Sequence, residues 1–249
     1  MSRKRIVIAA AILLIVVAGV AALLVVNRAR GPRSVADVLA KYGPGARARL
    51  KPFFTRAKVQ YPPKRLALLV FKDEKRVAVW ADGRFIRAYP VLAASGHAGP
   101  KLREGDSQVP EGLYRISGLN PNSSYHLSMR ISYPNPFDLR KAALDGRTRL
   151  GGDIFMHGKA LSIGCVAVGD PAIEELFTLV AETTLPRTNV IIAPNDLRAR
   201  GAILHEESPR WTAELYRAIA AALAQYPLWM ESDRTIGVDG MSKARQVLK

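Results

Sequence analysis

The sequence predicts an α+β protein with a β-rich core and flanking helices, preceded by one membrane-spanning helix. Three features predict this arrangement. A run of 21 uncharged residues, 6–26, lies near the amino end of the chain. Short apolar runs separated by turn residues begin at Arg65, and segments 170–182 and 208–226 carry apolar residues at helical spacing. We therefore expect strands in the middle of the chain and helices towards its carboxyl end.

The first 27 residues are predicted to be an uncleaved signal anchor. Residues 6–26 would form a helix about 31 Å long, enough to cross a hydrocarbon core of about 30 Å. A cleaved signal peptide is the alternative, because residues 18–21 are small enough for a cleavage site, but the apolar run continues beyond them. Basic residues flank both ends of the run, so the positive-inside rule hardly decides its orientation.

The overall charge restricts the classes of partner. The 249 residues include 37 Lys and Arg against 21 Asp and Glu, a formal net charge of +16. Such a surface favours polyanions, namely nucleic acid, anionic lipid or an acidic wall polymer. No zinc-finger spacing, aromatic RNA-binding signature or helix-turn-helix is recognisable, so we expect no nucleic-acid partner. A single cysteine excludes an intramolecular disulfide.

Residues 28–64 are predicted to be a juxtamembrane linker with short helical pieces. Ser34 is a suitable cap for a brief helix, which Gly43, Pro44 and Gly45 are expected to break. The basic side chains of this segment would face anionic lipid headgroups or solvent, and they include Arg47, Arg49, Lys51, Arg56 and Lys58.

Residues 65–200 are predicted to be the main folded domain. Segments 66–71, 77–81 and 85–92 form a three-stranded meander, with an Asp82-Gly83 hairpin turn between the last two. Further strands are expected at 125–133, 153–156 and, centrally, 189–193. Asp170 is expected to cap the first helix, with Pro171 in its first turn. Residues 201–249 would add a second helix and a basic tail.

The candidate site lies in residues 155–170. The only cysteine, Cys165, follows a turn-prone Ser-Ile-Gly and lies eight residues after His157. A thiol attacks as the thiolate, so a cysteine nucleophile needs a base such as His157 nearby. Gly164 lets the backbone bend so that consecutive N–H groups, including that of Cys165, point at one oxyanion. The alternative is a buried, inert cysteine.

The pattern His157-Gly158, a three-residue spacer and then Ser162-Ile163-Gly164-Cys165 resembles the active-site signature of the L,D-transpeptidase (YkuD-type) family. The resemblance covers about residues 65–198. Three further segments resemble one branch of the family, which groups murein L,D-transpeptidase-like proteins with a relative that detaches lipoprotein from peptidoglycan. They are residues 99–101 (Gly-Pro-Lys), 110–114 (Pro-Glu-Gly-Leu-Tyr) and 131–135 (Ile-Ser-Tyr-Pro-Asn).

The resemblance implies a β-sandwich core and a cysteine acyl-enzyme. Cys165 would be the nucleophile and His157 the general base, the N–H groups of Gly164 and Cys165 would be the oxyanion donors, and Ser162 would hold the turn. The segments that match the family also suggest four substrate contacts, namely Gly158, Ile163, Lys101 and Tyr133. The chain departs from the common pattern in its short spacer, in Ile163 where a second histidine is usual, and in Ala167 where an arginine is usual.

The implied function is a peptidoglycan L,D-transpeptidase acting on stem peptides from a single-pass membrane anchor, with its catalytic domain outside the cytoplasmic membrane. A hydrolytic relative, either a carboxypeptidase or an amidase that releases wall-linked lipoprotein, is the first alternative, and a non-catalytic wall-binding scaffold is the second. The four histidines lack metal-ligand spacing and Ser162 lacks a Gly-x-Ser-x-Gly elbow. We therefore expect no metal or cofactor. An anionic membrane surface is a further expected partner.

Overall fold

The computed structural model describes residues 31–96, 99–204 and 206–228. The chain divides into Met1–Ser34 and a compact body, Val35–Lys249, to which everything below refers. The predicted anchor, residues 6–26, and the predicted tail, residues 232–249, lie outside the described ranges. Within those ranges no helix has both the length and the apolar character needed to cross a membrane.

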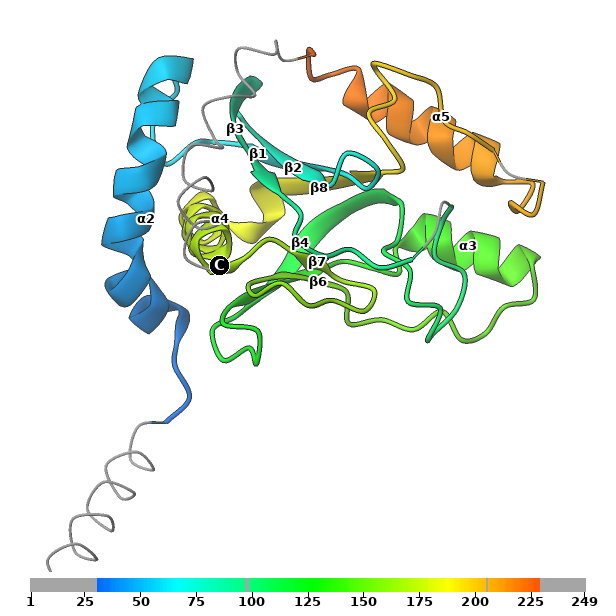
Figure 1. Cartoon of the computed structure of the whole chain (residues 1–249), viewed down its shortest axis with the longest axis horizontal. Coiled ribbons are helices and arrows are strands. Elements are labelled where there is room, and N and C mark those ends of the chain that lie inside the picture. Colours follow the sequence, from blue (N-terminus) through cyan, green and yellow to red (C-terminus); the bar gives the residue numbers. More distant parts are fainter. Residues whose placement is uncertain (1–30, 97–98, 205, 229–249) are drawn as a thin grey trace, which may run out of the picture. The chain divides into compact units, whose positions relative to one another are not determined.

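Eight strands form one sheet in the order β3-β2-β1-β8-β4-β5-β6-β7 (Figure 1). Most neighbours are antiparallel, but β8 runs parallel to β1 and β7 runs parallel to β6. The strands are β1 (Leu66–Phe71), β2 (Arg76–Ala81), β3 (Arg84–Pro90), β4 (Gly112–Asn120), β5 (Ser128–Ile131), β6 (Phe155–His157), β7 (Val166–Ala167) and β8 (Thr188–Ala193). The helices are α2 (Val35–Ala57), α3 (Pro136–Leu144), α4 (Asp170–Thr183), the short 3-10 helix η1 (Leu185–Arg187) and α5 (Thr212–Leu223).

The predicted meander is confirmed as β1, β2 and β3. Asp82 and Gly83 both have positive φ, 48° and 80°, as a two-residue turn with the twist of a hairpin requires. The central strand expected at 189–193 is confirmed as β8, which lies between β1 and β4.

The sheet curls until its two edges meet. The N–H of Leu92, just after β3, donates to the carbonyl of Ala167 in β7 at 2.8 Å, and Ala167 N–H donates to the Ala93 carbonyl at 3.0 Å. The expected sandwich is therefore a single curled sheet whose two halves enclose one core. This closure brings the segment after β3 beside the loop that carries Cys165.

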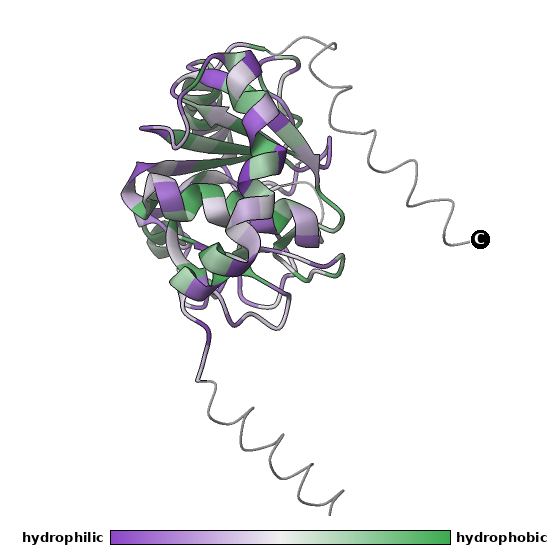
Figure 2. Cartoon of the chain, turned by 90° about the vertical axis from the view of Figure 1, so that its left-hand side faces the viewer, coloured by the Kyte–Doolittle hydropathy of each residue, from purple (hydrophilic) through white to green (hydrophobic). Residues whose placement is uncertain are grey.

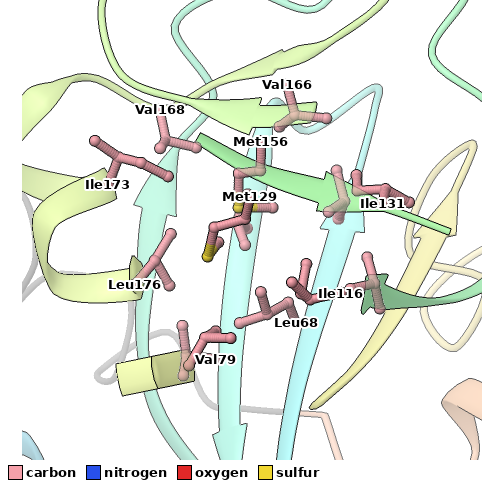
Figure 3. Close-up of a cluster of buried hydrophobic side chains, with 14 of the residues drawn as sticks. Leu68, Val79, Ile116, Met129, Ile131, Met156, Val166, Val168, Ile173 and Leu176 are labelled. Carbon is pink, nitrogen blue, oxygen red and sulfur yellow. The ribbon is translucent and has the colours of Figure 1, made fainter. Parts of the chain in front are cut away.

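The central strands are buried on both faces. In β1, Leu66, Leu68 and Val70 join the larger core, whereas Ala67, Leu69 and Phe71 join a second core under α5. Alternation of side chains across a strand explains the division. The larger core takes residues from both halves of the sheet and from α4, and Figure 3 shows Leu68, Val79, Ile116, Met129, Ile131, Met156, Val166, Val168, Ile173 and Leu176 directed into it.

The helix break predicted at residues 43–45 is wrong. α2 runs unbroken from Val35 to Ala57 through Pro44 and Pro52. Its buried residues recur every four positions at Ala46, Leu50 and Phe54, and this stripe joins the larger core. Packing of that stripe offsets the poor helix propensity of glycine and proline. Part of the expected linker is therefore a docked helix, along which hydrophilic and hydrophobic residues alternate (Figure 2).

Sequence reasoning missed β4 and α3. No helix was expected at residues 136–144, but α3 begins there with a capping box. The Asn135 side chain accepts from Asp138 N–H at 2.9 Å, and the Asp138 carboxylate accepts from Asn135 N–H at 2.8 Å. The signal was present as Asn-Pro followed by an acid three residues after the cap. α5, by contrast, confirms the helix expected within 208–226.

Candidate active site

Cys165 lies at the end of a serine-stabilised turn that leads into β7. The Ser162 hydroxyl accepts the Cys165 N–H at 2.9 Å and donates to the Cys165 carbonyl at 2.7 Å. Gly164 has a φ of +86°, which side-chain-bearing residues rarely adopt. The sequence Ser-Ile-Gly-Cys therefore folds into this turn because Ser162 bridges both backbone groups of Cys165 and Gly164 supplies the left-handed step.

β6 and β7 pair in parallel, and this pairing places the strand that carries His157 beside the strand that follows Cys165. Met156 lies opposite Val166, and His157 lies opposite Ala167. Cys165 directly precedes Val166, and its sulfur lies 3.4 Å from the Phe155 backbone nitrogen, which donates to it. Phe155 and His157 are two residues apart on one strand, so their side chains extend to the same face.

The hydrogen bonding of His157 determines its tautomer. Nδ1 lies 2.6 Å from the Gly158 carbonyl oxygen, which can only accept a hydrogen bond. Nδ1 must therefore carry the proton, and in the neutral ring Nε2 holds the lone pair. This is the nitrogen that a general base needs, and the Gly158 carbonyl orients it.

Burial keeps both groups neutral at rest. It lowers the pKa of His157, which is only 2 % exposed, although the hydrogen bond to Gly158 acts in the opposite direction. Burial also raises the pKa of the Cys165 thiol, with a smaller lowering effect from the Phe155 N–H. Asp153 raises the thiol pKa further and Lys101 lowers it. The resting pair is accordingly a thiol and an imidazole, not a thiolate and an imidazolium.

The two expected oxyanion donors each contact a different serine. Cys165 N–H is bound by Ser162, as described above, and Gly164 N–H donates to the hydroxyl of Ser95. Ser95 in turn donates to the Ser107 carbonyl at 2.7 Å, which ties the cysteine turn to the segment after β3. Sequence reasoning missed Ser95, because only the closure of the sheet brings it next to Gly164.

The loop after His157 is held tightly. Asp170 accepts the Lys159 N–H at 2.7 Å, so this carboxylate fastens the histidine loop instead of capping α4 as expected. Gly169 occupies the cap position, and Asp170 is the first helical residue. Gly158 lies so close that an added Cβ would be 2.5 Å from Asp170 Oδ1 and 2.8 Å from the Tyr125 carbonyl oxygen.

Tyr125 is a second neighbour of His157 that sequence reasoning missed. Its ring centroid lies 4.6 Å from that of His157, and 44 % of the residue is exposed. The adjoining His126 lies 3.0 Å from Glu174 in α4 and contacts the Tyr42 ring of α2. The loop between β4 and β5 thus covers the histidine and contacts both helices. Only tertiary structure brings it there.

The four expected substrate contacts lie in different surroundings. Ile163 is 83 % exposed beside Cys165, and Gly158 adjoins His157. The Lys101 ammonium is buried between Asp106, at 2.6 Å, and the Arg103 carbonyl, at 2.9 Å. Tyr133 is a core residue whose hydroxyl donates to the Leu150 carbonyl at 3.2 Å. Among the described residues no group of His, Cys, Asp and Glu is placed to hold a metal ion.

A known protein family matches the part of the chain that contains these residues. The L,D-transpeptidase catalytic domain family (YkuD) matches residues 65–192. The provisionally named L,D-transpeptidase YafK of Escherichia coli (strain K12) is 31 % identical over 134 residues, which are 50 % of this chain and 52 % of YafK. The same identity is found for YafK of Escherichia coli O157:H7, so the chain spans about half the length of the curated relatives it matches.

Solved structures that match part of this chain include the helical cell shape determining protein Pgp2 of Campylobacter jejuni. Its TM-score is 0.43 at 24 % identity, over 55 % of this chain and 50 % of Pgp2. L,D-transpeptidase 1 of Mycobacterium tuberculosis has a TM-score of 0.31 at 14 % identity, over 51 % of this chain and 61 % of that protein. On the family match across residues 65–192, this chain belongs to the L,D-transpeptidase catalytic domain family.

Proposed function

We propose that this protein is a peptidoglycan L,D-transpeptidase that acts through a Cys165 acyl-enzyme. The observation that carries the proposal is that Cys165 contacts the strand β6, at Phe155, and that the same strand carries His157, whose Nδ1 is committed to the Gly158 carbonyl. That commitment leaves Nε2 as the basic nitrogen. Stem peptides are the proposed substrate because the family to which the chain belongs acts on them.

The neutral resting pair defines the proton transfers. As the Cys165 sulfur attacks the carbonyl of a donor stem peptide, its proton passes to Nε2 of His157, and the C–N bond then breaks as the imidazolium returns that proton to the leaving amine. A thioester to Cys165 results. An acceptor amine attacks it, gives a proton to His157 and forms the new amide, and the sulfur leaves as the thiol. Water in place of the amine would complete a hydrolysis.

The oxyanion of each tetrahedral intermediate would bind the N–H groups of Gly164 and Cys165. Both groups are now hydrogen-bonded to serine hydroxyls, Ser95 and Ser162. The carbonyl oxygen of the substrate would replace both serine hydroxyls at these N–H groups, and its stabilisation would increase as negative charge develops on it.

The deciding experiment is incubation of the full chain with purified disaccharide tetrapeptides, followed by mass spectrometry. Loss of the terminal D-alanine together with cross-linked dimers would support transpeptidation, and loss without dimers would indicate a carboxypeptidase. The Cys165→Ala variant should be inactive in either case. If neither product forms, release of lipoprotein from sacculi would identify an amidase, and no activity in any of these assays would favour the scaffold.

We also propose that residues 6–26 anchor the catalytic domain outside the cytoplasmic membrane. The uncharged length of that segment supports this proposal. Of the basic residues expected to face anionic lipid, Arg47 and Arg49 are instead paired with acids of α4, so electrostatic membrane contact would depend on the exposed Lys51, Arg56 and Lys58. Retention in the membrane fraction after alkaline extraction, together with protease accessibility in spheroplasts, would test the anchor and its orientation.

A further inference from the structure

A groove of about 420 Å³ lies on the outer face of the sheet, the face turned away from the larger core, over β4 and β8. Arg115 of β4 and Asn189 of β8 lie opposite each other in its floor. Gln225 and Tyr226, which follow α5, line one side, and Asn135, which caps α3, lines the other. The groove is therefore completed by residues beyond the region that matches the family.

The groove is lined mainly by neutral polar groups. Three of its side chains are amides, namely Asn135, Asn189 and Gln225, and Tyr226 adds a half-buried aromatic ring. Among the described residues that line it, none is acidic and Arg115 is the one cation. The Arg115 guanidinium and the Gln225 amide are exposed and form no hydrogen bond or ion pair within the described part of the chain. Such a lining suits a ligand rich in hydroxyl and amide groups.

The groove and the candidate site share one face of the sheet. Arg115 of β4, Arg130 of β5 and Phe155 of β6 each directly precede a residue of the larger core, so all three extend to the outer face. Phe155 is also the residue whose N–H donates to the Cys165 sulfur. β4 is two strands away from β6, which corresponds to about 10 Å across the sheet.

The surface between the groove and the cysteine is exposed. Arg130 forms an ion pair with Asp153 at 3.1 Å, and the two side chains are 52 % and 80 % exposed. The carbonyl oxygen of Asp153 lies 3.8 Å from the Cys165 sulfur. A ligand held at Cys165 can therefore extend over this ion pair towards the groove.

We propose that this groove binds the N-acetylated disaccharide to which the stem peptide is attached. The inference rests on the proposed function, because the substrate of that function carries the sugar. Loss of the terminal residue of a tetrapeptide leaves three residues between the sugar and the attacked carbonyl, and three extended residues span about 10 Å. The hydroxyl and acetamido groups of the sugar bind Arg115 and Gln225, and the apolar face of a sugar ring packs on Tyr226.

The test is a calorimetric titration of the full chain carrying Cys165→Ala, with disaccharide tetrapeptide and the same tetrapeptide without sugar as probes. The disaccharide form should bind about tenfold more tightly. The double substitution Arg115→Ala with Gln225→Ala should abolish this difference and leave binding of the free tetrapeptide unchanged. Arg84→Ala with Gln60→Ala is the matched control, because both residues are exposed and lie outside the groove, and it should change nothing.

Turnover gives a second measurement in the chain that keeps Cys165. The groove double substitution should raise the KM for disaccharide tetrapeptide about tenfold at unchanged kcat, since the sugar contacts lie far from the reacting bond. The KM for free tetrapeptide should stay the same.

The proposal is overturned if the sugar adds no affinity, or if the control substitution has the same effect as the groove substitution. It is also overturned if the groove substitution weakens the free tetrapeptide equally, since the groove would then bind peptide. Sugar-dependent binding without turnover would support the groove and contradict the proposed acyl transfer. Turnover of both tetrapeptides at the same KM would support the acyl transfer and overturn the groove.

Discussion

Burial acts in opposite directions on the pKa values of Cys165 and His157, the two residues proposed to exchange a proton. Burial raises the pKa of the thiol and lowers that of the imidazole, so neither group is charged near neutral pH. In the proposed mechanism the thiol loses its proton only as it attacks the substrate. Other cysteine enzymes form the thiolate before the substrate arrives. The reactivity of the free enzyme distinguishes the two situations.

Alkylation of Cys165 by iodoacetamide should therefore still accelerate between pH 7 and pH 9. The thiolate is the reactive form, so its fraction and the rate rise about tenfold per pH unit below the thiol pKa. The measurement is the pseudo-first-order rate of mass addition, and Cys165→Ala gives the background because the chain has no other cysteine. A rate that has already levelled off at pH 7 would instead show a preformed thiolate.

Gly158→Ala should damage both activity and stability. The added methyl group would approach Asp170 Oδ1 to 2.5 Å and the Tyr125 carbonyl oxygen to 2.8 Å, so the loop that orients His157 has to move. We expect turnover to fall by about tenfold or more and the free energy of unfolding to fall by about 1–3 kcal/mol. Gly152→Ala is the control, since a Cβ there meets no atom within 4 Å. Equal turnover and equal unfolding free energy in the two variants would contradict the claim that close packing at Gly158 orients the His157 loop.

At the scale of elements, one buried glutamate joins α2, β3 and α4. Glu175 of α4 is 3 % exposed and accepts from Arg49 of α2 at 2.6 Å. It also accepts from Arg87 at 2.7 Å and from the Tyr89 hydroxyl at 2.6 Å, both of β3. The apolar stripe of α2 and this acid together hold the helix against the domain. These two sets of contacts therefore determine where α2, which precedes the matched family region, lies on the domain.

Glu175→Ala should lower the free energy of unfolding by about 3 kcal/mol. The loss arises because the largely buried Arg87 guanidinium would lose its carboxylate partner. Chemical denaturation followed by circular dichroism measures the change. Glu214→Ala is the matched control, because Glu214 is half exposed where it pairs with Lys141 and should cost less than about 1 kcal/mol. A similar loss in both variants would mean that burial of the ion pair is unimportant.

At the scale of the whole molecule, the curled sheet depends on helices that lie outside the matched family region. α2 covers the larger core through Leu50 and Phe54, and α5 covers the second core through Leu215 and Ile219. Residues 65–192 alone would expose both surfaces. The folded unit is therefore larger than the domain that the family match defines.

A chain that begins at residue 59, without α2, should unfold at a lower temperature than one that begins at residue 31. It should also bind a hydrophobic dye, because the apolar stripe of α2 no longer covers the core around α4. Differential scanning calorimetry and dye fluorescence on both chains provide the comparison. An unchanged unfolding temperature would show that α2 is dispensable for the fold.

Much of this protein follows from the sequence alone, because it depends on neighbouring residues. The meander follows from apolar runs and the Asp82-Gly83 turn, and the helices near 170–182 and 208–226 follow from their spacing. The Ser162–Cys165 turn and the proximity of His157 follow from a local motif. These features are determined over a few residues, where propensity and periodicity act directly.

The rest was decided by tertiary structure, because it depends on partners far away in the chain. α2 continues through Gly43 and Pro44 only because its buried stripe has a core to join. Ser95 reaches Gly164 only once the sheet has curled and closed. Tyr125 reaches His157 only through the pairing of β5 with β6. Long-range packing and the low dielectric of the interior set these relations, and local pattern carries no information about either.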